Sequence, residues 1–304
     1  MLHHFQRKPQ PRAAEEARRE GIEDLAAHVA VRRGRLAEAE ARGDELHVRT
    51  RAGERGGELV VVRRRERGRV GDNDSHGPRL RGVGLLIRTW NLFHGNTVPP
   101  ERRAYLREMI ELVTADDPDV VCLQEVPVWA LGRLERWSGM HAVGAVGAGP
   151  LLASAELGRW ITELNHGLLR SAVTGEGIAT LVARRHAIVG ERRDAVGPRR
   201  VLLGVRLEDG PLVCNFHVTG GEVAEEQFRA VVRLAGDGRL VIAGDVNLWP
   251  PYAVEGFSEP LAGSIDQILV RGLPSTPPTA WPAERRRVDG KLLSDHAPVE
   301  LTVG

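Results

Sequence analysis

The sequence predicts an α+β protein in which strands form two packed sheets and helices lie outside them. From Val83 onward, short apolar runs recur, each bounded by Gly, Pro or a cluster of charges, as is typical of strands. Segments with apolar residues at helical spacing lie between these runs. The predicted strands outnumber the helices and their connections are mixed, which favours a layered α+β body.

Residues 1–82 differ from the rest of the chain. They are rich in Arg, Ala, Glu and Gly and carry more basic than acidic residues. Polar helices over 11–42 and a short strand over 58–62 are compatible with the pattern, but the apolar content is too low for a separate core. We expect a disordered or loosely helical extension, with a regulatory or nucleic-acid-binding arm as the alternative. Residues 83–304 are then the folded domain.

The elements of the folded domain can be placed in order from their boundaries. The predicted strands are 84–91, 119–126, 177–184, 199–208, 212–218, 240–247, 264–272 and 297–303. The predicted helices are 101–117, 128–138, 151–170 and 223–235.

Composition and cysteine use restrict the class of protein. The hydrophobic fraction of 42% is enough for a real core. Cys122 and Cys214 lie in Val-rich runs, so we expect buried, reduced thiols. No apolar stretch approaches the length of a membrane span, and the N-terminus lacks the apolar region of a secretory signal. We therefore expect a cytoplasmic protein.

Most of the predicted strands begin or end with polar side chains that a core strand does not need. They are Asn91, Glu125, Asn215, His217, Asp245, Asn247, Asp266, Asp295 and His296. Singly, each fits a rim residue, a core histidine or a turn. Strand ends in a layered sheet converge on one edge, however, and we expect the set to gather there.

Four carboxylates at one edge would repel each other and raise each other's pKa values unless a positive charge joined them. The set contains no Lys or Arg, but a hard divalent cation would serve. The oxygen atoms of Asn91, Glu125 and Asp295 suit Mg²⁺, or Mn²⁺. The absence of cysteine from the set argues against a structural zinc site.

Six short motifs occur in a characteristic order: WNLFHG, LQEV, NFHV, GDVN, SIDQILV and SDHAPV. Together they resemble the motif series of the endonuclease/exonuclease/phosphatase family, over about residues 85–303. That family includes deoxyribonuclease I-like nucleases, apurinic-site endonucleases, neutral sphingomyelinases and inositol-phosphate phosphatases. The resemblance implies a four-layer α/β/β/α sandwich with its site at one edge of the two sheets.

The resemblance also implies roles for the metal and the water. Asn91 and Glu125 match metal-binding residues, and Asp295 matches a second carboxylate on the metal side. Asp245 matches the residue that orients or deprotonates the attacking water. Asn247 matches its partner, which holds the phosphate. An ionised Asp and a bound cation are what phosphoester hydrolysis requires, since one acts on the water and the other neutralises oxygen charge.

The remaining matches involve the histidines. His217 matches a donor to a phosphate oxygen or leaving group, and His296 a second histidine held by Asp266. A carboxylate behind a histidine keeps it protonated near neutral pH. Glu176 matches the acidic partner of His217 only loosely, because it precedes its strand. Asn215 is assigned with Asn247 to substrate binding.

Several residues depart from the family pattern or stay open. Tyr105 and Tyr252 do not match the catalytic tyrosine of the apurinic-site enzymes, which argues against repair specificity. His94 follows the metal-binding Asn but is interpreted as a loop residue. Trp249 and Trp281 lie in Pro-rich loops and are expected to be buried anchors there, with stacking on a base or sugar as the alternative.

The predicted function is a divalent-metal-dependent hydrolase of phosphoester bonds, acting as a phosphodiesterase or nuclease. The alternative is a phosphomonoesterase, or a lipid-headgroup or inositol-phosphate phosphatase, of the same fold. A lower-ranked alternative is a non-catalytic nucleic-acid-binding protein. The expected partner is a phosphoester substrate, with nucleic acid as one candidate, and no obligate protein partner is inferred.

Overall fold

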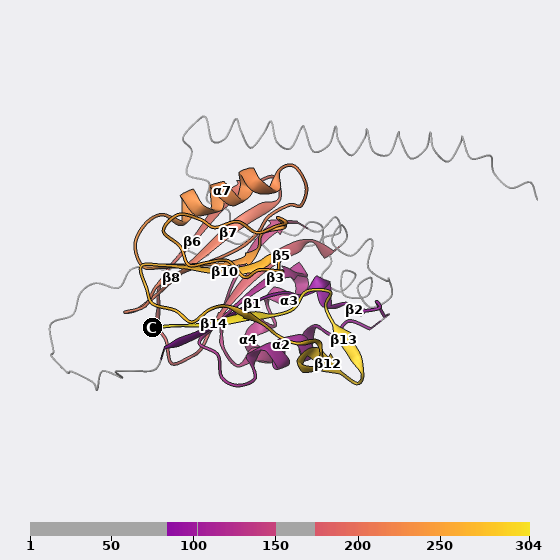
Figure 1. Ribbon diagram of the computed structural model, residues 1–304. Coiled ribbons are helices and arrows are strands. Elements are labelled where there is room, and N and C mark those ends of the chain that lie inside the picture. Colours follow the sequence, from indigo (N-terminus) through magenta and orange to yellow (C-terminus); the bar gives the residue numbers. More distant parts are fainter. Residues whose placement is uncertain (1–83, 102, 150–173) are drawn as a thin grey trace, which may run out of the picture. The chain divides into compact units, whose positions relative to one another are not determined.

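A computed structural model describes residues 84–101, 103–149 and 174–304. The predicted extension 1–82 and the predicted helix over 151–170 lie outside this part of the chain. Within it, two mixed sheets pack face to face and helices cover their outer faces (Figure 1). Among the described residues, none forms a helix of the length and apolar character needed to cross a membrane.

The first sheet has the strand order β11-β14-β1-β3-β5-β4. Its strands are β1 (Leu85–Asn91), β3 (Val120–Val126), β4 (His141–Ala148), β5 (Glu176–Val182), β11 (Thr279–Ala280) and β14 (Val299–Val303). β1 and β3 are parallel, and the other pairs are antiparallel. The ends of β1 and β3 therefore meet at one edge.

The second sheet has the order β10-β9-β8-β7-β6, with β8 and β9 parallel. Its strands are β6 (Ile188–Gly197), β7 (Arg200–Leu207), β8 (Leu212–His217), β9 (Leu240–Asp245) and β10 (Asp266–Arg271). A small third sheet joins β12 (Arg287–Val288), β13 (Lys291–Leu293) and β2 (Thr97–Val98). Two 3₁₀ helices, η1 (Phe93–Gly95) and η2 (Ala283–Arg286), lie in the connections.

Three apolar clusters define four layers. One fills the space between the sheets. A second joins the first sheet to α2 (Leu106–Thr114), α3 (Val128–Leu131) and α4 (Leu134–Ser138). A third joins the second sheet to α7 (Ala224–Ala235), which lies on the opposite side in Figure 1. This arrangement confirms the predicted α/β/β/α sandwich.

The eight predicted strands are all present, but two long strands were not predicted. β4 has the sequence HAVGAVGA, whose small residues have low strand propensity. β6, at one end of its sheet, alternates half-buried with exposed residues and carries charges. The helix predicted over 128–138 is instead two short helices, α3 and α4, separated at Gly132, a residue that weakens helices. Cys122 and Cys214 are buried and free, as predicted.

Candidate active site

The side chains of the second sheet reach the site because of strand periodicity. On β9, Val241 and Ala243 point into the core between the sheets, so Asp245 at the same parity points there too. β8 is parallel to β9 and pairs His217 with Asp245. β10 is antiparallel and pairs Asp266 with Asp245. Three polar side chains are thus brought to one edge.

The first sheet contributes from the facing layer. Asn91, at the end of β1, donates from Nδ2 to Glu125 Oε1 (3.2 Å) and to Asp245 Oδ2 (3.1 Å), which links the two sheets. Because β14 runs antiparallel to β1, the residues before it lie at the same edge. Trp90 Nε1 donates to the backbone oxygen of His296 at 3.0 Å and fixes that segment.

The backbone around the site adopts conformations that cost energy. Glu125 has φ +51° and Asn247 has φ +45°, both in the left-handed region that disfavours residues other than glycine. Gly244 is required for another reason: a Cβ there would lie 2.0 Å from the backbone oxygen of Phe216. The small residue before Asp245 therefore lets β8 and β9 approach closely.

His217 is held by a carboxylate that has its own positive partner. Its Nδ1 lies 2.7 Å from Glu176 Oε1, and the guanidinium of Arg200 also pairs with Glu176. Burial raises the pKa of Glu176, but the hydrogen bond and charge of His217 and the charge of Arg200 lower this pKa to about 2. The Nε2 atom of His217 lies 3.5 Å from Asp245 Oδ2, so it faces the site.

His296 is held by a carboxylate without such a partner. Its Nδ1 donates to Asp266 Oδ2 at 2.8 Å, and its Nε2 lies 4.0 Å from Asp245 Oδ2. Burial raises the pKa of Asp266 to about 6, against the effect of His296. Burial lowers the pKa of His296, but the hydrogen bond and charge of Asp266 raise it to about 9. Between these values the pair is ionised, and His296 carries a proton.

The donor chemistry at this edge fits a hard divalent cation. Burial raises the pKa of the Asp295 carboxyl, and the charge of Glu125 raises it further, so two carboxylates repel there. Asp245, Asp266 and His296 also bring one ligand atom each within 4.8 Å of one another. The hydrogen bond between His296 and Asp266 already engages two of those three groups. Glu125 and Asp295 also offer carboxylate oxygens of the kind that Mg²⁺ prefers.

Asn247 and Asn215 have different surroundings. The backbone N–H of Asn247 donates to Asp245 Oδ1 at 2.8 Å, and its Nδ2 lies 3.3 Å from His217 Nε2, so it borders the site. Asn215 is fully buried. Its Nδ2 donates to the backbone oxygens of Leu123 and Ala179, and its Oδ1 accepts from Gln124. Its polar atoms are thus used between the sheets, and the predicted role in substrate binding is wrong.

Three residues near the site were missed or undervalued in the sequence. The loop residue His94 is buried in η1, with Nε2 3.2 Å from Glu125 Oε2. Ser294 is buried, donates to the Asn91 backbone oxygen at 2.7 Å and accepts from the His296 N–H at 3.1 Å. Only its place beside Asp295 could have marked it. Arg200 is one of many arginines, so nothing in the sequence distinguishes it.

The two loop tryptophans differ. Trp281 is buried, with 4% of its surface exposed, as predicted for a loop anchor. Trp249 is 68% exposed, so the prediction of burial was wrong there. It lies two residues after Asn247, and a large exposed ring is therefore placed close to the site.

Comparison with known families agrees with the fold. The endonuclease/exonuclease/phosphatase family matches residues 89–296. This span contains the residues assembled above, and the chain belongs to that family. The members of this family are phosphoesterases, and this chain is therefore an enzyme of that class. The comparison with curated proteins gives no match.

Solved structures with the same architecture come from several organisms. An endonuclease/exonuclease/phosphatase from Beutenbergia cavernae DSM 12333 is similar with a TM-score of 0.54 and 18% identity, over 73% of this chain and 72% of that one. An endonuclease/exonuclease/phosphatase from Bacteroides vulgatus is similar with a TM-score of 0.52 and 14% identity, over 73% of this chain and 99% of that one. TDP2 from Caenorhabditis elegans is similar with a TM-score of 0.50 and 15% identity, over 74% of this chain and 75% of that one. At these identities the likeness shows the fold alone.

Proposed function

We propose that this protein is a divalent-metal-dependent phosphodiesterase that acts on nucleic acid. The observation that carries the proposal is the convergence on Asp245. Its Oδ2 atom accepts from Asn91 and lies 3.5 and 4.0 Å from the Nε2 atoms of His217 and His296. A carboxylate between two histidines can orient a water and also lie beside donors for the charge that develops on oxygen.

Each side chain then has a role that its contacts support. Asp245 orients or deprotonates the attacking water. His296, protonated through Asp266, donates to a phosphate oxygen, and His217 donates to another oxygen or to the leaving group. The Asn247 amide borders His217 and completes the phosphate contacts.

The implied cation would be held by Glu125 and Asp295, with the Asn91 amide oxygen as a further ligand. It would neutralise charge on the phosphate oxygens. Because Asn91 Nδ2 also donates to Asp245, this residue would keep the ion and the water-orienting carboxylate in a fixed relation.

The charge balance of the site favours a diester over a monoester. Carboxylates dominate the edge, and two guanidinium groups that border it are committed. Arg200 pairs with Glu176, and Arg286 donates to backbone oxygens of residues 293, 294 and 296. A phosphodiester carries one negative charge and a monoester up to two, so the monoester would meet more repulsion. The exposed Trp249 offers a ring on which a base can stack.

The proposal is tested with bis(p-nitrophenyl) phosphate and p-nitrophenyl phosphate in Mg²⁺. We expect faster hydrolysis of the diester, complete loss with a chelator, and at least a ~100-fold fall in kcat for Asp245→Asn. Asp237→Asn, at an exposed carboxylate in the loop before β9, is the matched control and should keep full activity. Preference for the monoester would favour the phosphatase alternative. Unchanged activity in Asp245→Asn would remove the assigned site.

A further inference from the structure

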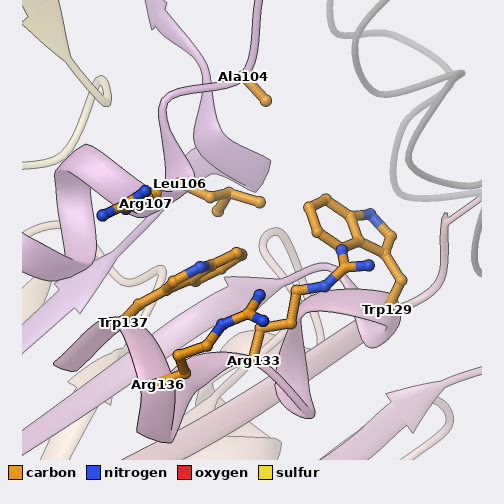
Figure 2. A pocket seen from close by; sticks show the side chains of 7 residues that line it. All are labelled: Ala104, Leu106, Arg107, Trp129, Arg133, Arg136 and Trp137. Carbon is orange, nitrogen blue, oxygen red and sulfur yellow. The ribbon is translucent and has the colours of Figure 1, made fainter. Parts of the chain in front are cut away.

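A pocket lies outside the carboxylate edge, between the start of α2 and the helices α3 and α4. It has a volume of about 280 Å³ and is lined by Ala104, Leu106, Arg107, Trp129, Arg133, Arg136 and Trp137. This volume is near the lower end for ligand pockets, about 300–1,000 Å³. It suits one small group and not a duplex. Figure 2 shows the side chains of Arg133 and Arg136 extending toward the space beside the two indole rings.

The pocket combines flat aromatic surface with positive charge. The rings of Trp129 and Trp137 meet edge to face, with centroids 6.3 Å apart, and the guanidinium of Arg133 lies 4.9 Å from the Trp129 centroid. Arg107 is paired with Glu111. Within the described part of the chain, neither Arg133 nor Arg136 has a carboxylate partner. Two positive charges are therefore available to an anion.

The residues that line the pocket lie close to those of the candidate active site. Trp129 follows Glu125 by four residues, so their Cα atoms are at most ~14 Å apart. On the other wall, Leu106 packs against Gly95 of η1, the turn whose His94 contacts Glu125. A strand whose scissile phosphate lies at the carboxylate edge can therefore reach the pocket with a nearby nucleotide.

We propose that this pocket binds a nucleotide flanking the scissile bond of a single-stranded nucleic-acid substrate. Its base contacts the tryptophan wall, and its phosphate pairs with Arg133 and Arg136. Aromatic rings beside a positive groove are the general means of holding single strands, and bases within a duplex are not available for such stacking. The inference rests on the proposed diesterase function and names its substrate class.

Direct binding tests the pocket without requiring catalysis. Fluorescein-labelled (dT)8 is titrated with the full chain in a chelator and followed by anisotropy. We expect Arg133→Ala/Arg136→Ala to raise Kd at least ~5-fold and to reduce its salt dependence. Arg233→Ala/Arg239→Ala removes the same charge from exposed positions on α7 and before β9, and should change Kd less than twofold. Trp129→Leu should weaken binding, and Trp129→Phe should restore it.

Kinetics separate this inference from the proposed function. The double variant of Arg133 and Arg136 should raise KM for (dT)8 and leave kcat/KM for bis(p-nitrophenyl) phosphate unchanged. Equal weakening by both double variants, or no binding of (dT)8 by the wild type, would overturn the pocket assignment. If the wild type hydrolyses no diester but pocket-specific binding persists, the proposed function fails and the binding site stands.

Discussion

The site contains two buried histidine–carboxylate pairs with opposite electrostatics. In the pair of His217 and Glu176, the carboxyl pKa falls to about 2. In the pair of His296 and Asp266, burial raises the carboxyl pKa to about 6. The contacts are alike, 2.7 and 2.8 Å from each Nδ1.

The difference in pKa comes first from burial, which is deeper at Asp266 than at Glu176, and then from the third group beside each pair. Arg200 supplies a positive charge to Glu176, whereas Asp245 supplies a negative charge to Asp266. The Glu176 carboxylate therefore stays ionised at any moderate pH, whereas the ionisation of Asp266 depends on the positive charge of His296. The comparison indicates that Glu176 holds His217 in place at all moderate pH values. We expect the pair of His296 and Asp266 to set the pH range in which the enzyme is active.

The largest effect is expected where one change separates β8, which carries His217, from β9, which carries Asp245 and pairs with the strand of Asp266. In Gly244→Ala the new methyl group meets the Phe216 backbone oxygen, so β8 and β9 must separate and His217 and Asp245 move apart. We expect a loss of ~3 kcal/mol in the free energy of unfolding, measured in urea, and loss of diesterase activity. Gly190→Ala on β6 is the control, since its nearest atom lies at 3.7 Å. Equal stability of the two variants would contradict the close approach.

The next largest effect is expected in the pH dependence of the rate, which should respond to the pair of His296 and Asp266. The rate should fall as pH rises through about 9, where His296 loses its proton. Asp266→Asn removes the hydrogen bond and the largest of the charges that raise the His296 pKa and leaves those of Asp245 and Asp295, so this limb should move down toward 6.5, with a ~100-fold lower rate at pH 8. The control is Asp119→Asn. Asp119 lies just before β3 and contacts His186, so its loss should leave the pH profile of the rate unchanged. An unmoved limb in Asp266→Asn would exclude His296 as the titrating donor.

The smallest effect on rate is expected at Glu176. Glu176→Gln should lower kcat ~10-fold and cost ~3 kcal/mol of stability, because Arg200 loses its partner. The folded pKa of Glu176 is lowered from 4.5 to about 2, so its contribution is present above about pH 4.5 and is lost as pH falls through about 2. The stability gap between wild type and variant, measured by urea unfolding, should narrow over that range.

Glu225→Gln, at an exposed carboxylate paired with Arg229, is the control for this variant and should change neither quantity. A gap that stays constant down to pH 2 would show that Glu176 is not held ionised by its partners.

The sequence alone determined eight of the strands, though not β4 or β6, and which side chains of a strand share a face. Asp245 follows Val241 and Ala243 at a period of two, and the same rule applies to His217 and Asp266, so their direction follows from local chemistry. The motif order also identified the family, now matched over residues 89–296. The cytoplasmic location stays a prediction.

Only the tertiary structure decided which side chains contact one another and which are buried. Arg200 joins Glu176, Asn215 is used between the sheets, and Trp249 is exposed whereas Trp281 is buried. The pocket of Trp129 and Arg133 likewise needs α2 to lie beside α4 and the residues just before it. A residue's own sequence neighbourhood fixes its periodicity, but its partner and its burial depend on distant segments brought beside it, and local patterns do not contain that information.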